Sequence, residues 1–243
     1  MEPVVIADNV SALWVYLAER PLTWLTVTIG AYAAADAVAS ASGRHPLVNP
    51  VVLAAAIVIA CLWATATPFG TYFEGAQFVH FLLGPATVAL AVPLVENFAT
   101  VKRAALPILV ALLVGSVVAA GSAVAIGYAF GLPREVLVSL APKSVTTPIA
   151  MGIAGELGGI PALTAVLVIT TGIIGAVCVT PLMNALRVKD MAARGFAVGV
   201  AAHGIGTARA FQVDPLAGAF AGIGMALNGA ATALLVPAIL LLL

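Results

Sequence analysis

Five stretches of the chain are almost entirely apolar and long enough to cross a membrane. A membrane-spanning helix needs about 20 mostly apolar residues. The runs that reach this length are Leu22–Ala41, Leu47–Ala66, Ala105–Phe130, Pro161–Leu186 and Gly218–Leu243. An outer-membrane barrel would instead show short segments in which polar and apolar residues alternate. The pattern therefore predicts an all-α, polytopic membrane protein with about five full spans.

Three further segments are apolar but interrupted by proline, glycine or polar residues. They are Ala76–Val95, Arg134–Gly158 and Lys189–Phe211, and each is expected to contain two half-helices around a break. Proline removes a backbone donor and clashes with the carbonyl four residues earlier, so it interrupts a helix. The sequence thus predicts two or three broken or re-entrant helical segments in addition to the full spans.

The distribution of basic residues favours a re-entrant path for one of these segments. Loops on the cytoplasmic side of a membrane carry an excess of lysine and arginine. When every interrupted segment crosses, the loops on the two sides carry five and three basic residues. When Arg134–Gly158 instead enters and leaves on one side, the split becomes six and two, whether Ala76–Val95 crosses or not. We therefore expect Arg134–Gly158 to form a re-entrant hairpin.

Parts of the chain repeat at an interval of about 54–57 residues, and self-similarity at a steady interval indicates repeated structural units. The pattern L-x-P-x-[T/S]-V occurs at Leu83–Val88 and again at Leu140–Val145. The spans that follow these two motifs also align with each other, from Leu106 and from Ile160. Interrupted helices in repeated halves are typical of transporters built from inverted repeats.

A weaker echo of the repeat relates AAHGIGTARA at residues 201–210 to APKSVTTPIA at residues 141–150. The chain thus consists of a broken element followed by a span, repeated two or three times. We expect a single membrane domain over residues 1–243. In it, residues 1–75 form a scaffold or an interface, and residues 76–243 form the core that carries the repeat.

The composition agrees with a membrane location and excludes several classes of function. Hydrophobic residues make up 63% and charged residues 8% of the chain, whereas soluble domains carry about 25% charged residues. The net charge is zero and the basic residues are scattered, which excludes the usual footprint of nucleic-acid binding. Cys61 and Cys178 lie inside apolar runs, without the spacing of a disulfide framework or a metal site. No metal or other cofactor is expected.

One interrupted segment, LAPKSVTTPIAMGIAGELGG, contains a lysine, Lys143. A basic residue in the middle of a membrane costs about 2.5–3.5 kcal/mol on insertion scales. In one interpretation the hydroxyls only repair the broken backbone and the lysine snorkels to the interface. In the other, its ammonium and the free amides at a helix N-terminus bind an anion. The prolines that bracket the break and the hydroxyl residues between them are Pro142, Pro148, Ser144, Thr146 and Thr147.

The second polar cluster is the sequence HGIGTARA, which starts at His203. Gly204 and Gly206 allow a break or a close approach of helices. Arg209 offers a planar fork that matches a carboxylate. His203 can carry a proton near neutral pH, or it can form a hydrogen bond between helices. On a regular helix it would share a face with Thr207.

These residues do not form a recognisable catalytic site. Lys143 and Ser144 superficially suggest a serine–lysine dyad, but adjacent residues of a helix point about 100° apart. The sequence contains neither a cluster of metal ligands nor a G-x-S-x-G motif. We therefore do not expect an enzyme.

Several motifs closely resemble those of the LrgB/CidB family of membrane proteins. They are LVNPVVLA, FLLGPATVALAVPL, PKSVTTPIA, GGIPALTAV and HGIGTARA, and the resemblance extends from about Leu47 to the C-terminus. It implies either transport of small carboxylates, or a holin-like or antiholin-like protein that controls murein hydrolase export and autolysis. The family's polar residues fall on Lys143, Ser144, Thr146, Thr147, His203, Thr207 and Arg209.

The chain departs from the family pattern around the second cluster. Ala201 and Ala202 occupy positions where relatives often carry small hydroxyl residues, and Ala217 replaces a frequent glutamate. These changes remove hydrogen-bond acceptors and leave the coupling ion and the substrate open. Asp214 is a candidate replacement for the missing carboxylate.

We therefore expect a secondary transporter of small monocarboxylates or hydroxycarboxylates, such as pyruvate, lactate, glycolate or glycerate, in the bacterial inner membrane. The carboxylate is expected between the two breaks, neutralised by Lys143 or Arg209, with His203 as the proton carrier of a proton-coupled cycle. The alternative is a holin-like or antiholin-like pore or lesion regulator. Expected partners are the lipid bilayer, further copies of the chain and a small LrgA/CidA-type subunit. Supporting positions are Pro85, Thr87, Pro142, Pro148, Gly204, Gly206 and Asn228, the last through a hydrogen bond between helices.

Overall fold

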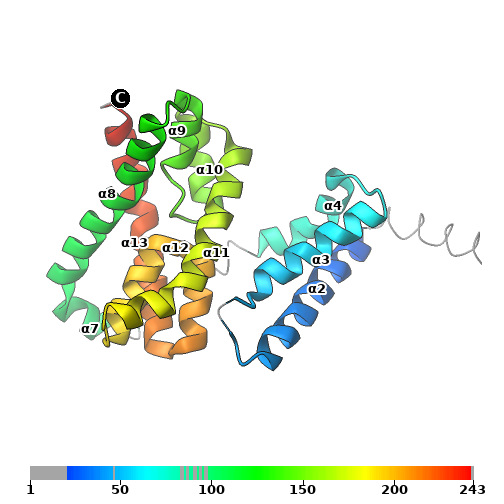
Figure 1. The fold of residues 1–243 in the computed structure, drawn as a ribbon, viewed down its shortest axis with the longest axis horizontal. Coiled ribbons are helices and arrows are strands. Elements are labelled where there is room, and N and C mark those ends of the chain that lie inside the picture. The colour runs from blue at the N-terminus through cyan, green and yellow to red at the C-terminus, as the bar shows by residue number, and fades with distance from the viewer. Residues whose placement is uncertain are drawn as a thin grey trace, which may run out of the picture. The chain divides into compact units, whose positions relative to one another are not determined.

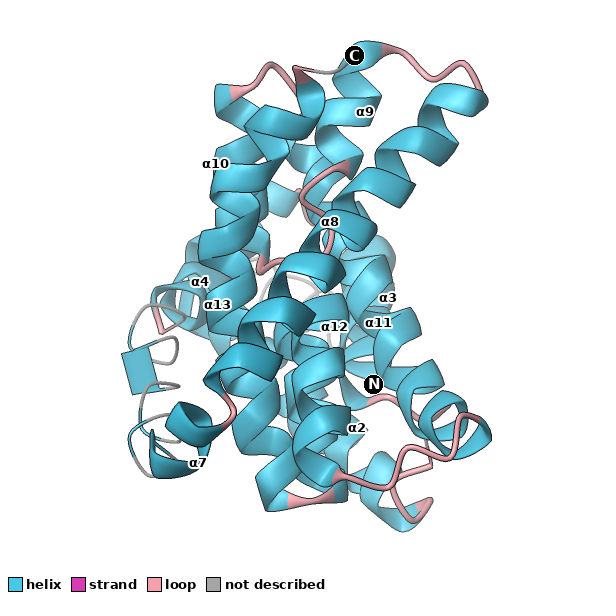
Figure 2. Cartoon of the chain, turned by 90° about the vertical axis from the view of Figure 1, so that its left-hand side faces the viewer, coloured by secondary structure: helices cyan, strands magenta, loops and turns pink. Residues whose placement is uncertain are grey.

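The computed structural model describes residues 21–45, 47–82 and 98–241, together with Pro85, Val88, Ala89, Val92 and Val95. Within these residues every regular element is a helix and none is a strand (Figures 1 and 2). The all-α prediction is confirmed. The chain divides into two compact units, Met1–Val88 and Ala89–Leu243, and each is described by itself.

The first unit contains α2 (Pro21–Ala41), α3 (Pro50–Ala64) and α4 (Phe69–Phe81). Trp24 of α2 is fully buried, and its ring meets the ring of Tyr72 in α4 edge to face, with 5.9 Å between centroids. Such aromatic pairs add about 0.5–1.5 kcal/mol to the gain from burial. This contact therefore holds α4 against α2.

Four helices are long and apolar enough to cross a membrane, and they agree with four of the five predicted spans. They are α2, α8 (Ala105–Ala129), α11 (Pro161–Ala185) and α13 (Pro215–Leu240). The fifth, predicted over Leu47–Ala66, is the shorter helix α3. Its 15 residues cover about 22 Å at 1.5 Å per residue, less than the hydrocarbon thickness of about 30 Å.

The start of α3 explains its length. The Asn49 side-chain oxygen accepts a hydrogen bond from the Val51 amide at 2.8 Å, and Pro50 occupies the first helical position. Asparagine caps and first-turn prolines both fix a helix start. The interrupted segment Ala76–Val95 lies largely outside the described residues, as does Thr87. Pro85 is helical and exposed.

In the second unit, the first two helices given bounds are α7 (Phe98–Arg103) and the span α8. After α8 come α9 (Arg134–Leu140) and α10 (Thr147–Glu156), then the span α11, then α12 (Met191–Val213) and finally the span α13. The helical segments between the spans are therefore α9 with α10, and α12.

Helices α9 and α10 form a re-entrant hairpin, called here the first hairpin (residues 134–156). A Cβ at Gly127, near the end of α8, would lie 2.7 Å from the side chain of Leu137 in α9. The Ser139 hydroxyl, also in α9, accepts a hydrogen bond at 2.8 Å from the amide of Ile160, where α11 starts. The hairpin thus enters and leaves at one end of the unit, as Figure 1 shows, in agreement with the prediction for Arg134–Gly158.

Helix α12 also folds back on itself, at Ala202 and His203, and is called the second hairpin (residues 191–213). His203 has a φ of 41° and a ψ of −138°, far from helical values. A Cβ at Gly206 would lie 2.9 Å from the side chain of Val198, whereas residues eight apart in a straight helix are about 12 Å apart. The break predicted in Lys189–Phe211 is confirmed, and because the two arms run antiparallel the segment is re-entrant.

A span and the hairpin that follows it form a unit that occurs twice. The spans begin at Ala105 in α8 and at Pro161 in α11. The hairpins begin at Arg134 and at Met191, so they are separated by almost the same interval as the spans. The copies run in opposite directions, because α8 ends and α11 begins where the first hairpin enters. The sequence predicted a unit of broken element plus span, whose first broken element lies largely outside the described residues; within the described residues the repeated unit is a span followed by a hairpin, and its two copies are inverted.

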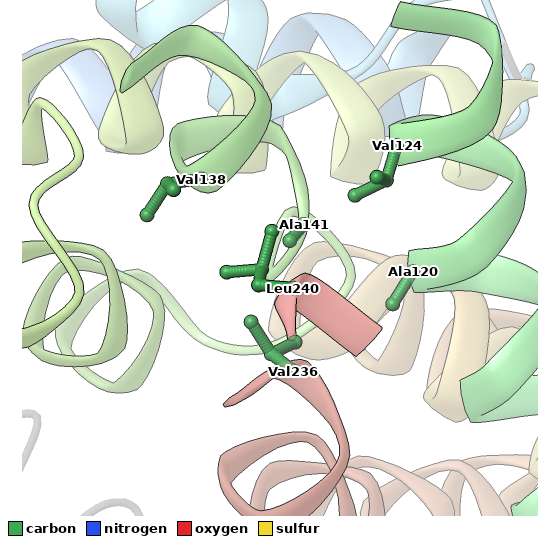
Figure 3. Packing of buried hydrophobic residues seen from close by; sticks show 6 residues of the cluster. All are labelled: Ala120, Val124, Val138, Ala141, Val236 and Leu240. Carbon is green, nitrogen blue, oxygen red and sulfur yellow. The ribbon is translucent and has the colours of Figure 1, made fainter. Parts of the chain in front are cut away.

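An apolar cluster closes the end of the unit at which the first hairpin enters. It joins side chains of α8, of the first hairpin and of the C-terminal part of α13 (Figure 3). Because these side chains are buried together, the base of the first hairpin is held between two full spans. The members are Ala120, Val124, Val138, Ala141, Val236 and Leu240.

Two glycines let the first arm of the second hairpin lie directly against α13. A Cβ at Gly195 would meet the carbonyl oxygen of Ala217, and a Cβ at Gly199 would meet that of Ala221. We expect Gly199→Ala to lower the free energy of unfolding by about 1–3 kcal/mol, because the overpacked helices must move apart. Denaturant titration in mixed micelles measures this change.

The matched control is Gly121→Ala in α8, where an added Cβ meets open space. Alanine is a better helix former than glycine by about 1 kcal/mol, so this variant is expected to be as stable as the unmodified protein or more so. Equal losses of stability in both variants would contradict the packing argument.

Candidate functional site

The tips of the two hairpins meet at a single asparagine of α13, Asn228. Its side-chain nitrogen donates one hydrogen bond to the carbonyl oxygen of Ser144 at 3.3 Å, in the first tip. It donates another to the carbonyl oxygen of Val200 at 2.9 Å, two residues before the second break. Both carbonyls belong to backbone at or next to a break, so the amide replaces partners that helix geometry no longer supplies.

The oxygen of the same carboxamide bonds to α8 and to the next turn of α13. It accepts a hydrogen bond from the Ser116 hydroxyl of α8 at 2.6 Å and another from the Thr232 hydroxyl at 3.3 Å. Asn228 is 1% exposed, and both its donors and both its acceptor sites are used. One buried side chain therefore links α8, α13 and both hairpins.

The second contact between the hairpins is made by Val168, in the middle of α11. Val145 of the first tip packs on its side chain. The His203 Nε2 atom of the second tip lies 2.8 Å from its carbonyl oxygen. A carbonyl only accepts hydrogen bonds, so Nε2 carries the proton in this contact. The bond secures a residue whose positive φ costs about 1–3 kcal/mol.

A cavity of about 750 Å³ opens beside the first tip. It is lined by Ala104 and residues of α8 between 107 and 119, by Lys143 and Ser144, by Asp190 and residues of the second hairpin's first arm, and by Phe220. Among these lining residues the polar side chains are those of Lys143, Ser144 and Asp190. The walls are otherwise apolar.

The polar groups of this cavity lie at its two ends. Asp190 caps the second hairpin, accepting a hydrogen bond from the Ala193 amide at 2.7 Å. Residues 190–200 cover about 15 Å of helix, about half the thickness of a membrane core. The cavity therefore runs from the entry of the second hairpin to the level of the tips, where Lys143 is found.

Lys143 is half-buried, and its ammonium donates a hydrogen bond to the Ser144 hydroxyl at 3.3 Å. Among the described residues, one ion pair is found, and it joins Arg44 and Asp36 in the first unit. No described carboxylate therefore pairs with Lys143. Burying an unneutralised ammonium is costly. A carboxylate or a similar anion in the cavity would remove that cost.

The hydroxyl residues after the lysine belong to the start of α10. Thr146 is the N-cap residue, with extended backbone and no side-chain capping bond, and Thr147 begins the helix. Amides in the first turn of a helix lack partners within it and favour negative charge nearby. Pro148 has no amide hydrogen, so the donors in this turn are those of Thr147 and Ile149.

The residues predicted in the second cluster have different surroundings. The Thr207 hydroxyl donates to the carbonyl oxygen of His203 at 2.8 Å and so satisfies backbone freed by the break. Arg209 lies in the second arm, six residues beyond the tip, and donates to the Gln212 side chain at 3.4 Å. Arg209 is not among the residues that line the described cavity. The structure thus brings Lys143 and His203 to the meeting tips and places Arg209 away from them.

Sequence reasoning underestimated Asn228 and missed Ser116 and the Val168 carbonyl. An asparagine in an apolar span predicts a hydrogen bond between helices, but not three bonds to three other elements and a fourth within its own helix. Asp214, considered as a replacement carboxylate, instead caps α13 by accepting from the Leu216 and Ala217 amides at 2.8 and 3.0 Å.

The helices and tips define a polytopic helical membrane protein in which two re-entrant hairpins enter from opposite ends and meet at mid-depth. The sequence of residues 28–242 matches the family model of the LrgB-like family. The chain belongs to this family. It is an integral protein of the bacterial inner membrane.

Relatives cover most of the chain. YwbG of Bacillus subtilis is 35% identical over 81% of this chain and 88% of its own length. The holin-like protein CidB of Staphylococcus epidermidis is 32% identical over 82% and 87%, and that of Staphylococcus aureus 31% over 82% and 86%. No solved structure matches the chain significantly. The predicted resemblance is confirmed, and the relatives' names favour the holin-like alternative over carboxylate transport.

Proposed function

We propose that this holin-like family member is a carrier of small organic anions, with its site at the first hairpin tip. One observation carries the proposal: Lys143 presents an ammonium without a described carboxylate partner to a cavity that ends at mid-depth. A lysine at this depth is expensive to keep unless it has a function. A pore would need polar groups along a continuous path, whereas the polar groups here are confined to the cavity's two ends.

In this proposal the carboxylate of the substrate lies against the Lys143 ammonium, the Ser144 hydroxyl and the first-turn amides of α10. Hydrogen bonds to a charged group are each worth about 1.5–3 kcal/mol, so two or three compensate for dehydration without preventing release. The apolar walls accept the rest of a small monocarboxylate. His203 lies at the tip of the second hairpin, the element equivalent to the first, and it positions that hairpin through its Nε2 atom. Its Nδ1 atom is the candidate proton acceptor for proton-coupled transport.

Several predictions about assembly remain part of the proposal. The first unit is the expected scaffold or oligomer interface. A small LrgA/CidA-type membrane protein is the expected partner, as the resemblance to the family implies. The preferred acid, whether pyruvate, lactate, glycolate or glycerate, follows from a transport screen with and without that partner.

Reconstitution into proteoliposomes tests the function directly. The carrier proposal expects saturable uptake of labelled pyruvate, lactate or glycolate, and counterflow when the vesicles are preloaded with the unlabelled acid. Vesicles without protein provide the background. Absence of saturable uptake for every acid, with or without the partner, would refute the carrier.

The holin-like alternative is favoured by the names of the relatives. If the protein forms such a pore or lesion, we expect entrapped dyes and inorganic ions to be released at a rate that does not saturate with their concentration. The same vesicles therefore distinguish the two functions, because a carrier retains the dye while it exchanges the acid.

A further inference from the structure

The two hairpins are equivalent elements of the inverted repeat, but they pack differently against the span that precedes each of them. The second hairpin is closed on its span, α11. Its His203 ring bonds the Val168 carbonyl at 2.8 Å. The ring also covers Gly172, where a Cβ would lie 2.7 Å from the His203 Cε1 atom. No room remains between this tip and α11.

The base of the first hairpin packs on the end of its own span, α8, but its tip stands apart from the middle of that span. The cavity of about 750 Å³ separates Lys143 and Ser144 from the side of α8 that carries Ala111 and Gly115. The hydrogen-bond connection between this tip and α8 is indirect. Ser116 of α8 donates to the Asn228 side chain, and Asn228 donates to the Ser144 carbonyl. That last bond, at 3.3 Å, is longer than the 2.9 Å bond to Val200 in the second hairpin, and longer bonds of this type are weaker.

The same unit of span plus hairpin therefore adopts two packings within one molecule. Because the units are related by sequence and by the matching order and spacing of their helices, the packing adopted by one is accessible to the other. We propose that the hairpins exchange these states in turn: the first closes on α8 as the second leaves α11. This inference rests on the proposed carrier function and supplies its access mechanism.

The exchange would open a second cavity from the opposite end of the unit. Val145 of the first hairpin also packs on this span, at Val168. When the second tip leaves α11 and the first hairpin moves toward α8, the face carrying Thr164, Val168 and Gly172 becomes the wall of that cavity, as the lining residues of α8 between 107 and 119 are now. Thr164 and Val168 have no exposed surface in the present state. Simultaneous opening would leak and simultaneous closure would trap the substrate, so a carrier needs the two movements to alternate.

Asn228 is placed to couple the two movements. It donates to both tips and lies on α13, which belongs to neither repeated unit. Both donors are occupied in the present state, and each tip that moves must give up one of them. At Asn228, the exchange therefore replaces one hydrogen bond by another of the same kind.

Cysteine reactivity during transport tests the inference. In a background with Cys61→Ser and Cys178→Ala, the single variants Ala111→Cys and Thr164→Cys are reconstituted and treated with a maleimide. At rest, the thiol on α8 is expected to react and the thiol on α11 to be protected. During exchange of pyruvate, lactate or glycolate, the reaction at position 164 should accelerate at least about tenfold, while that at position 111 slows.

The control is Val236→Cys, which lies in the fully buried cluster that no step is expected to open. It should stay unreactive under both conditions. Saturable uptake with an unchanged, protected thiol at position 164 would overturn the exchange while leaving the carrier function intact. Absence of uptake for all three acids would overturn both.

Discussion

Replacing Lys143 by methionine is expected to reduce saturable uptake of carboxylates by up to about 100-fold. The variant keeps the length and apolar stem of the side chain but removes the ammonium that faces the cavity. Loss of a hydrogen bond to a charged group removes about 3 kcal/mol of binding free energy at the upper end, and each 1.4 kcal/mol is about a factor of ten. Initial uptake rates over a range of concentrations measure the effect.

The stability of the same variant gives an independent check. Removing a half-buried charge without a described carboxylate partner relieves a desolvation cost, so Lys143→Met should unfold at the same denaturant concentration or a higher one. A loss of uptake caused by misfolding would instead appear as a lower midpoint. Arg209→Ala is the matched control, because that guanidinium donates to Gln212 and does not line the cavity.

Uptake should persist in Arg209→Ala at more than about half the original rate, given that exposed polar contacts contribute little. If instead Arg209→Ala abolishes uptake and Lys143→Met preserves it, the anion is bound by the second hairpin and not by the first tip. Normal uptake in both variants would end the proposal of a cationic site.

Replacing Asn228 by leucine is expected to produce the largest loss of stability. The substitution leaves the Ser144 and Val200 carbonyls and the Ser116 hydroxyl without the partner they share. Each buried group that loses its partner costs about 1–3 kcal/mol, although measured values within membranes are at the low end. We expect the free energy of unfolding to fall by about 2–4 kcal/mol, measured by denaturant titration in mixed micelles.

Asn184→Leu provides the comparison, because Asn184 is an exposed asparagine that pairs with Arg194 near the end of α11. Changes at exposed positions are usually within about 0.5 kcal/mol. Comparable losses in Asn184→Leu and Asn228→Leu would show that Asn228 is an ordinary polar residue and does not join the hairpins. Ser116→Ala, which removes one of the four bonds, should fall between the two.

The membrane class, four of the spans and the position of the first break were predictable from the sequence, because each depends on local properties. Runs of about 20 apolar residues are determined by membrane thickness alone. Pro142 and Pro148 disfavour a continuous helix through this segment, because proline lacks an amide hydrogen and clashes with the carbonyl four residues earlier. The cost of a charge at mid-depth singled out Lys143 without knowledge of its neighbours. α3 was overestimated because hydropathy ignores the cap at Asn49.

The reversal at His203 and the role of Asn228 were decided by tertiary structure. Alanine favours helix, so the sequence AAHG contains no strong signal that the chain turns back at Ala202. The reversal is possible because Gly206 lets the arms meet and because the Val168 carbonyl lies where the imidazole can bond it. The two partner carbonyls of Asn228 lie 84 and 28 residues away in the chain. Hydropathy acts on each segment separately, whereas these contacts exist only once α8, α11 and α13 bring both tips together.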